Sequence, residues 1–343
     1  MKDNKKHKKA EYGILITGLI ILLAVACIIA LCAGQYSVSV PEVIKILASR
    51  FVNVTKTWSN TAEGVVFTLR LPRIIGAVLV GSALSLSGAA YQGVFKNPLV
   101  APDLLGVSSG ACVGASVAIL LHLNSFGVQA MAFVAGILAV GLTLFIPRLI
   151  KNTNMTMLVL SGIIVKGIMD SVMGIIKYVA DPETELQSIT YWQLGSLTKV
   201  LPKDLFTVGP VIVAASVIIF LLRWRINILS LGDREAKTLG VSVTIVRNFI
   251  IICATLLTAS AVCISGTIGW GGLVIPHFAR MLTGPDNTKA IPASILMGAI
   301  FMVVIDTLAR ALTSVELPLS ILTGIIGAPF YIIILARQRM KLS

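Results

Sequence analysis

Residues 70–114 read RLPRIIGAVLVGSALSLSGAAYQGVFKNPLVAPDLLGVSSGACVG, and this stretch decides the fold class. Two apolar, glycine-rich segments flank a short polar connection at 96–103 that is rich in Pro and Asx residues, which are typical of turns. Small residues recur at every fourth position, at 77, 81, 85, 89 and 93, and again at 106, 110 and 114. Such ladders let helix backbones approach closely in lipid, where packing drives helix association. The stretch therefore predicts two tightly packed membrane helices joined by a turn.

The composition extends this prediction to the whole chain. Its 343 residues are 56% hydrophobic and 13% charged, and the mean hydropathy is +0.93. These values are typical of a polytopic membrane protein and exclude an ordinary soluble domain. Because a span needs about 20 apolar residues, the length allows about ten spans. We expect them at 12–34, 72–93, 104–122, 128–150, 157–179, 205–224, 243–264, 267–283, 291–311 and 318–336, with glycines and Pro276 interrupting the eighth.

The distribution of charge predicts the topology. With both termini cytoplasmic, the inner side carries about twice as many Lys and Arg residues as the outer side, as the positive-inside rule requires. The net charge of +13 is explained in this way, and no nucleic-acid partner is expected. Residues 1–11 and 337–343 are then cytoplasmic tails of a single membrane domain, 12–336. We expect short helices outside the membrane at 41–51 and within 181–204, and 225–242 is the longest cytoplasmic connection.

Nothing in the sequence predicts bond-making chemistry. The five cysteines lie in apolar segments without CxxC or Cys/His spacing, which argues against disulfides and metal sites. No GxxxxGK[ST] phosphate loop occurs, and no nucleophile–base pair or paired carboxylates are recognisable. His277 has no second ligand at metal spacing and is interpreted as structural. We therefore expect no catalytic residue, no metal and no cofactor, and we do not expect an enzyme.

Several motifs together resemble one family. They are NPLVAPDLLG at 97–106, GDREAKTLG at 232–240, GTIGWGGLVIPHFAR at 266–280, DTLAR at 306–310 and ELPLSILTGIIGAPF at 316–330. The chain resembles the FecCD-type permeases over about 65–335; these are the membrane subunits of ATP-driven importers for iron-siderophores, haem and cobalamin. The resemblance implies an all-α bundle of the type II ABC importer permease kind in the cell membrane. It also implies a second permease subunit (a copy or a paralogue), two cytoplasmic ATPase subunits, an extracytoplasmic binding protein and transport by alternating access.

The resemblance also implies two contact sites. The polar segment 225–242 takes the place of the coupling helix that sits in a cleft of the ATPase. Its predicted contact residues, with Asp233 as the expected helix cap, are Asp233, Arg234, Glu235, Ala236, Leu239 and Gly240. On the outer side, Arg70, Arg73 and Arg310 take the place of arginines that receive acidic residues of the binding protein. From the residues alone, Arg70 and Arg73 could instead anchor lipid headgroups, and Arg310 could pair with Asp306 at i,i+4.

The fifth predicted span carries an unusual polar stripe. Lys166, Asp170, Met173 and Lys177 follow helical spacing on one face. Charges inside a membrane are costly and normally face a bundle interior or a wet cavity. One interpretation is a stripe on the translocation pathway; the other is an i,i+4 Lys–Asp pair that only locks two helices. The sequence leaves both open.

The cargo is the least determined property. The motifs are shared by siderophore, haem, cobalamin and some oxyanion importers, and the run APDLLG at 101–106 favours an iron-siderophore or related chelate. A secondary transporter or channel is the rival from a different class. It would need intramembrane coupling-ion sites or a polar pore series, and only Lys166 and Asp170 could supply these.

Overall fold

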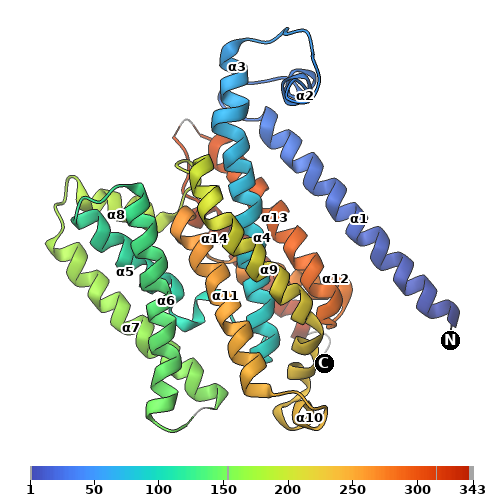
Figure 1. The fold of residues 1–343 in the computed structure, drawn as a ribbon, viewed down its shortest axis with the longest axis vertical. Helices are drawn as coiled ribbons and strands as arrows, with labels where there is room; N and C mark the ends of the chain where they lie inside the picture. Colours follow the sequence, from blue (N-terminus) through green and yellow to red (C-terminus); the bar gives the residue numbers. More distant parts are fainter. Residues whose placement is uncertain (1, 153, 314, 340–343) are drawn as a thin grey trace.

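The central element of the fold is α4 (Leu71–Phe95), in a computed structural model that describes residues 2–339 apart from 153 and 314. Through α3 (Asn60–Gly64) and a π-helical turn at Val65–Arg70, this helix continues unbroken from the top of the molecule in Figure 1. Most of α4 is buried, because α9 (Pro202–Leu231), α11 (Val243–Ser265), α12 (Gly271–Thr283) and α13 (Asn287–Ala311) pack around it. A helix that is apolar all round is expected in such a position.

The remaining helices flank this centre on two sides (Figure 1). On one side lie α5 (Val107–Leu120), α6 (Ser125–Leu149), α7 (Met155–Val179) and the short α8 (Glu185–Leu194). On the other side α1 (Lys2–Cys32) leans away from the bundle, and α2 (Val40–Ala48) follows it. The last helix is α14 (Leu319–Arg339), and two short helices, η2 (Pro102–Leu105) and α10 (Asp233–Thr238), lie in the connections. The start of α1 and the end of α14 lie toward the end of the bundle at which α10 lies (Figure 1).

The small-residue ladders are helix contacts, as predicted. A methyl group built on Gly81 would lie 2.2 Å from the carbonyl oxygen of Gly298 on α13. One built on Gly110 would lie 2.7 Å from the carbonyl oxygen of Ala135 on α6, and one on Gly114 would lie 2.3 Å from that of Met131 on the same helix. Backbones at these crossings are too close for any side chain larger than a hydrogen. This close packing is the type that stabilises helix bundles in lipid.

The helices agree with the expected all-α membrane fold. Within the described residues each of the ten predicted spans corresponds to one helix, seven of them long and apolar enough to cross a membrane, while Val107–Leu120 and Leu319–Ile332 are shorter apolar helices. The expected break in the eighth segment is wrong: α12 runs without interruption from Gly271 to Thr283 and includes Pro276, and only residues 267–270 before it are non-helical. The connection 225–242 is the main difference: α9 remains helical to Leu231, because the first residue that interrupts it is Gly232, at φ 147°. The connection between α9 and α11 is therefore limited to 232–242.

Candidate functional site

A cavity of about 360 Å³ lies between the helices around α4 and the group formed by α5, α7 and α8. Residues of α4, η2, α5, α7, α8, α11, the 267–273 segment and α14 line it. Its polar lining consists of Asp103, Ser108, Ser109, Lys166, Asp170, Gln193, Thr258, Thr267 and Ser320. A cavity of this size with a few converging polar groups is typical of a small-molecule site.

The polar stripe of α7 contributes charge to this cavity. Lys166 and Asp170 are exposed and line its wall, Met173 is buried against it, and Lys177 is half-buried further along the helix. Within the part of the chain that the structure describes, no ion pair of 4.0 Å or less joins Lys166 to Asp170 or to any other charged group. The role of the stripe on a translocation pathway stays a prediction. Two carboxylates, Asp103 and Asp170, face the cavity with one ammonium.

A strained turn forms part of the cavity wall. Trp270 has φ 68° and ψ −43°, and the Gly271 N–H donates to the Gly269 carbonyl at 2.8 Å. This is the geometry of a classic γ-turn, which is rare and strained for a residue with a side chain. The indole ring packs edge-on against Tyr331 with 6.3 Å between the ring centroids, and the built methyl group of Gly327 would lie 2.6 Å from the Trp270 Cβ. The motif placed an aromatic residue here, but nothing in the sequence predicted the turn.

The predicted docking arginines are buried in this structure. Arg70, Arg73 and Arg310 are 5%, 8% and 7% exposed. Two of them, Arg70 and Arg310, satisfy carbonyl groups that the end of α1 leaves without helical partners. Their guanidinium groups donate to the backbone carbonyls of Ala30, Leu31, Cys32, Ala33 and Tyr36. They therefore fasten the C-terminal end of α1 to the π-helical turn before α4 and to α13.

The third arginine joins a buried ion network. Arg73 Nε donates to both carboxylate oxygens of Asp306, at 2.8 and 3.0 Å, and its Nη1 donates to Glu316 at 2.8 Å. Arg310 lies 3.7 Å from Asp306, the i,i+4 pair that the sequence allowed. Burial raises the pKa of Glu316, but hydrogen bonds from Arg73 and Thr198 outweigh it, so this pKa lies below its ordinary value. Docking at these arginines stays a prediction, and a binding protein would have to displace these partners.

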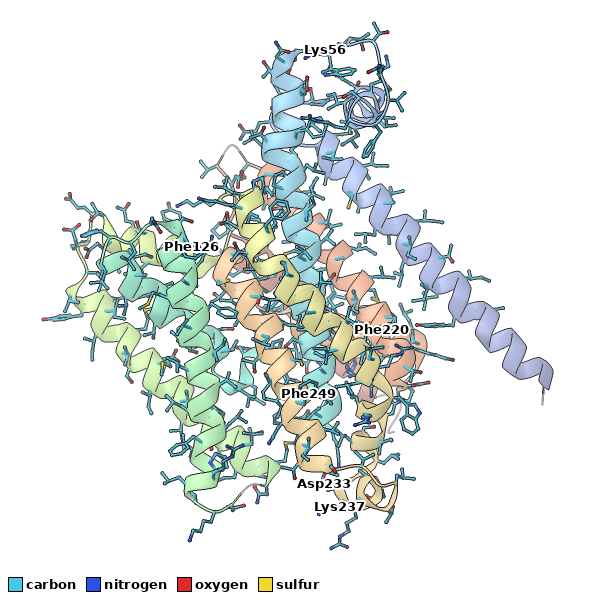
Figure 2. All side chains as sticks on the ribbon, viewed as in Figure 1. Lys56, Phe126, Phe220, Asp233, Lys237 and Phe249 are labelled. Atoms are coloured by element: carbon cyan, nitrogen blue, oxygen red, sulfur yellow. The ribbon has the colours of Figure 1, made fainter. Side chains whose placement is uncertain are left out.

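The α10 segment projects from the opposite end of the molecule from Lys56 (Figure 2). Ala236 is buried and holds the short helix to the bundle, whereas Arg234, Glu235, Leu239 and Gly240 are exposed. The expectation that Asp233 caps this helix is wrong. Gly232 occupies the cap position, because the Asp233 carboxylate instead accepts from Arg247 at 2.6 Å and lies 3.8 Å from Lys96. Gly240 ends the segment at φ 74°, as the sequence suggested.

Comparison with known proteins identifies the family. The family model described as "FecCD transport family" matches residues 22–337. The chain belongs to the FecCD transport family. It is 37% identical over 322 residues to the "Molybdate import system permease protein MolB" of Haemophilus influenzae, covering 94% of this chain and 95% of that one. It is 40% identical over 275 residues to a "Probable iron chelatin transport system permease protein" of Helicobacter pylori, covering 80% and 83%.

A solved structure agrees with this assignment. An ABC transporter assigned to the metal-chelate type, in an inward-facing conformation, superposes with a TM-score of 0.85 at 35% identity, covering 95% of this chain and 99% of that one. Membership of the FecCD family makes this chain a multi-pass membrane permease of an ABC importer, and the ATPase activity of such importers lies in separate subunits. The names of its relatives include both an oxyanion and an iron chelate, so the family alone does not fix the cargo.

Proposed function

We propose that this permease imports an iron-siderophore or related metal chelate, and that its cargo passes through the cavity between α4, α5, α7 and α12. Two such subunits, identical or paralogous, would face each other around the pathway. Two ATPases would bind the α10 surfaces, and a binding protein would deliver cargo at the opposite end. In this orientation both chain termini and α10 are cytoplasmic, which agrees with the excess of Lys and Arg expected on that side.

The charge of the cavity carries the choice of cargo. Asp103 and Asp170 outnumber Lys166 in the lining of each subunit. In a membrane interior of low dielectric constant, such a wall repels a small free dianion such as molybdate. A bulky chelate, which shields its metal and presents hydrogen-bonding groups, can instead bind the half-buried hydroxyl and amide groups of Ser108, Ser109 and Gln193. The volume of about 360 Å³ in a single subunit also suits a chelate better than a single oxyanion.

The fold supports alternating access as the transport mechanism. The cavity is bounded by separate helices and by the γ-turn at Trp270, so a small displacement of α7 or α12 would change its outline. The exposed Glu235 of α10 and Leu239 directly after it give an ATPase a compact surface to move. Cargo therefore crosses when nucleotide-driven movement at α10 shifts the population between two bundle conformations.

The test is to identify the cargo directly. The complex would be purified with its binding protein from cells grown with both molybdate and a ferric hydroxamate chelate. Elemental and organic mass spectrometry would then be applied to the bound material. We expect iron together with the chelator. Recovery of molybdenum without iron would refute the chelate assignment, and haem or cobalamin would redirect it within the same family.

A further inference from the structure

Arg280, in the last turn of α12, is hydrogen-bonded to two neighbouring helices. Its guanidinium donates to the side-chain oxygen of Gln92, to the Ala89 carbonyl at 3.1 Å and to the side-chain oxygen of Asn287 at 3.4 Å. Among the residues that the structure describes, no carboxylate lies within 4.0 Å of it. A half-buried cation held only by neutral acceptors is costly to desolvate. Its three acceptors come from two other helices, α4 and α13.

On one side this arginine leads to the cavity wall. The Gln92 amide donates to the carbonyls of Val100, at 3.3 Å, and Leu273, at 3.1 Å. Val100 immediately precedes the cavity-lining residues 101–103, and Leu273 itself lines the cavity. Because the Gln92 oxygen accepts from Arg280, its nitrogen must face these two carbonyls. The arginine thereby orients the amide that holds both wall segments to α4.

On the other side it leads to the end of α9. The Asn287 backbone N–H donates to the Asn227 side chain at 2.8 Å, and the Asn227 amide donates to Asp286 at 2.6 Å. Asp286 also caps α13 through the Thr288 N–H at 2.9 Å, which fixes its carboxylate. Asn227 lies in the last turns of α9, just before Gly232 and α10. A continuous series of hydrogen bonds therefore joins the α10 end of α9 to the cavity wall.

We infer that Arg280 is a positioning residue that transmits displacement of the α9 end, through Asn287 and Gln92, to the cavity wall. The inference rests on the proposed function, because it assigns the route by which an ATPase bound at α10 acts on the pathway. Hydrogen bonds in a medium of low dielectric constant are strong and directional. These hydrogen bonds make the cavity wall follow a displacement of α9, whereas contacts between apolar side chains alone would allow the helices to slide past one another. Because no carboxylate takes the place of the Gln92 oxygen at the guanidinium, Arg280 holds the Gln92 side chain with its nitrogen toward the cavity wall.

The experiment measures access to the cavity and needs no knowledge of the cargo. All five cysteines are replaced by alanine, and Ser109→Cys is introduced on the cavity wall. The permease–ATPase complex in lipid nanodiscs is labelled with a charged thiosulfonate reagent, with and without ATP plus vanadate. We expect nucleotide to change the labelling rate by about tenfold, within the usual range of allosteric coupling. Arg280→Met should reduce this change to below about twofold and leave basal ATPase activity intact.

Three further variants separate positioning from simple loss of stability. Arg280→Lys keeps a donor for Gln92 and should restore part of the nucleotide response. Asn227→Ala breaks the series at a half-buried position next to α10 and should remove the response as Arg280→Met does. Arg223→Met is the matched control, since this half-buried arginine lies at the same end of the bundle and, among the described residues, donates a hydrogen bond only to the Phe220 carbonyl of its own helix, at 2.8 Å. It should respond like the wild type, with thermal stability measured for every variant.

The outcomes distinguish the two proposals. A wild-type response retained in both Arg280→Met and Asn227→Ala would overturn the inference alone. A response lost equally in Arg223→Met would also overturn it, because the loss would then follow from any charge removed at this end. A wild-type complex without a nucleotide response would overturn the ATP-driven alternating access in the proposed function, and this inference with it.

Discussion

The buried carboxylate of Asp306 should be among the side chains most sensitive to change at the end of the bundle opposite α10. Its side chain is 1% exposed, and it accepts from Arg73 at 2.8 and 3.0 Å with Arg310 at 3.7 Å. Asp306→Asn removes the charge and leaves two guanidinium groups without their buried counter-ion. Removing one partner of a buried ion pair costs about 3–5 kcal/mol, and we expect a loss of that size in the free energy of unfolding.

Glu316 provides the matched comparison, because it bonds the same arginine at the same distance. Its side chain is 37% exposed, so solvent screens the charge. Glu316→Gln should therefore cost no more than about 1 kcal/mol. Both variants would be unfolded by titration with SDS in mixed micelles, followed by tryptophan fluorescence. A loss for Asp306→Asn as small as that for Glu316→Gln would refute the view that burial, rather than contact distance, sets the strength of this network.

Three further predictions follow from the site. Leu239→Asp should prevent co-purification of the ATPase while leaving membrane insertion unchanged, because it places a charge in the exposed apolar spot of α10; normal co-purification would remove this surface from the ATPase contact. The double variant Lys166→Met, Asp170→Leu should keep its thermal stability but take up less cargo or prefer a different one. Normal uptake by this stable variant would leave the pathway role of the stripe without support. The pKa of Glu316 is lowered on folding, so the stabilisation by its carboxylate is present above the ordinary value of 4.5 and is lost as the pH falls from there through the folded-state pKa. The wild type should therefore lose more stability on acidification than Glu316→Gln. Equal losses would contradict a stabilising Glu316 carboxylate.

The sequence predicts local properties of this protein well, for identifiable reasons. Hydropathy and helical periodicity act over neighbouring residues, so the ten helices and the close crossings at Gly81 and Gly114 follow from the pattern. The same locality explains the wrong expectations. Residues 225–231 are polar enough to suggest a connection, but only Gly232 interrupts the helix. Asp233 has a typical capping side chain, yet Arg247 binds it.

The functional contacts depend on residues far apart in the chain. Arg73 bonds Asp306 and Glu316, and the sequence pattern of an Arg-x-x-Arg pair at a span's end does not reveal that these partners bury it. The γ-turn at Trp270 depends on packing against Gly327 and Tyr331 of another helix. For the stripe on α7, periodicity placed Lys166 and Asp170 on one face, but only the arrangement of the helices around them shows a cavity there.

The most direct test of the central claim is uptake of a radiolabelled ferric chelate by proteoliposomes that contain the permease, its ATPase and its binding protein. The account predicts accumulation that requires ATP inside the vesicles, is unaffected by dissipating ion gradients and is lost when Leu239→Asp separates the ATPase. Accumulation driven by an ion gradient in the absence of ATP would contradict it and would make this chain a secondary transporter.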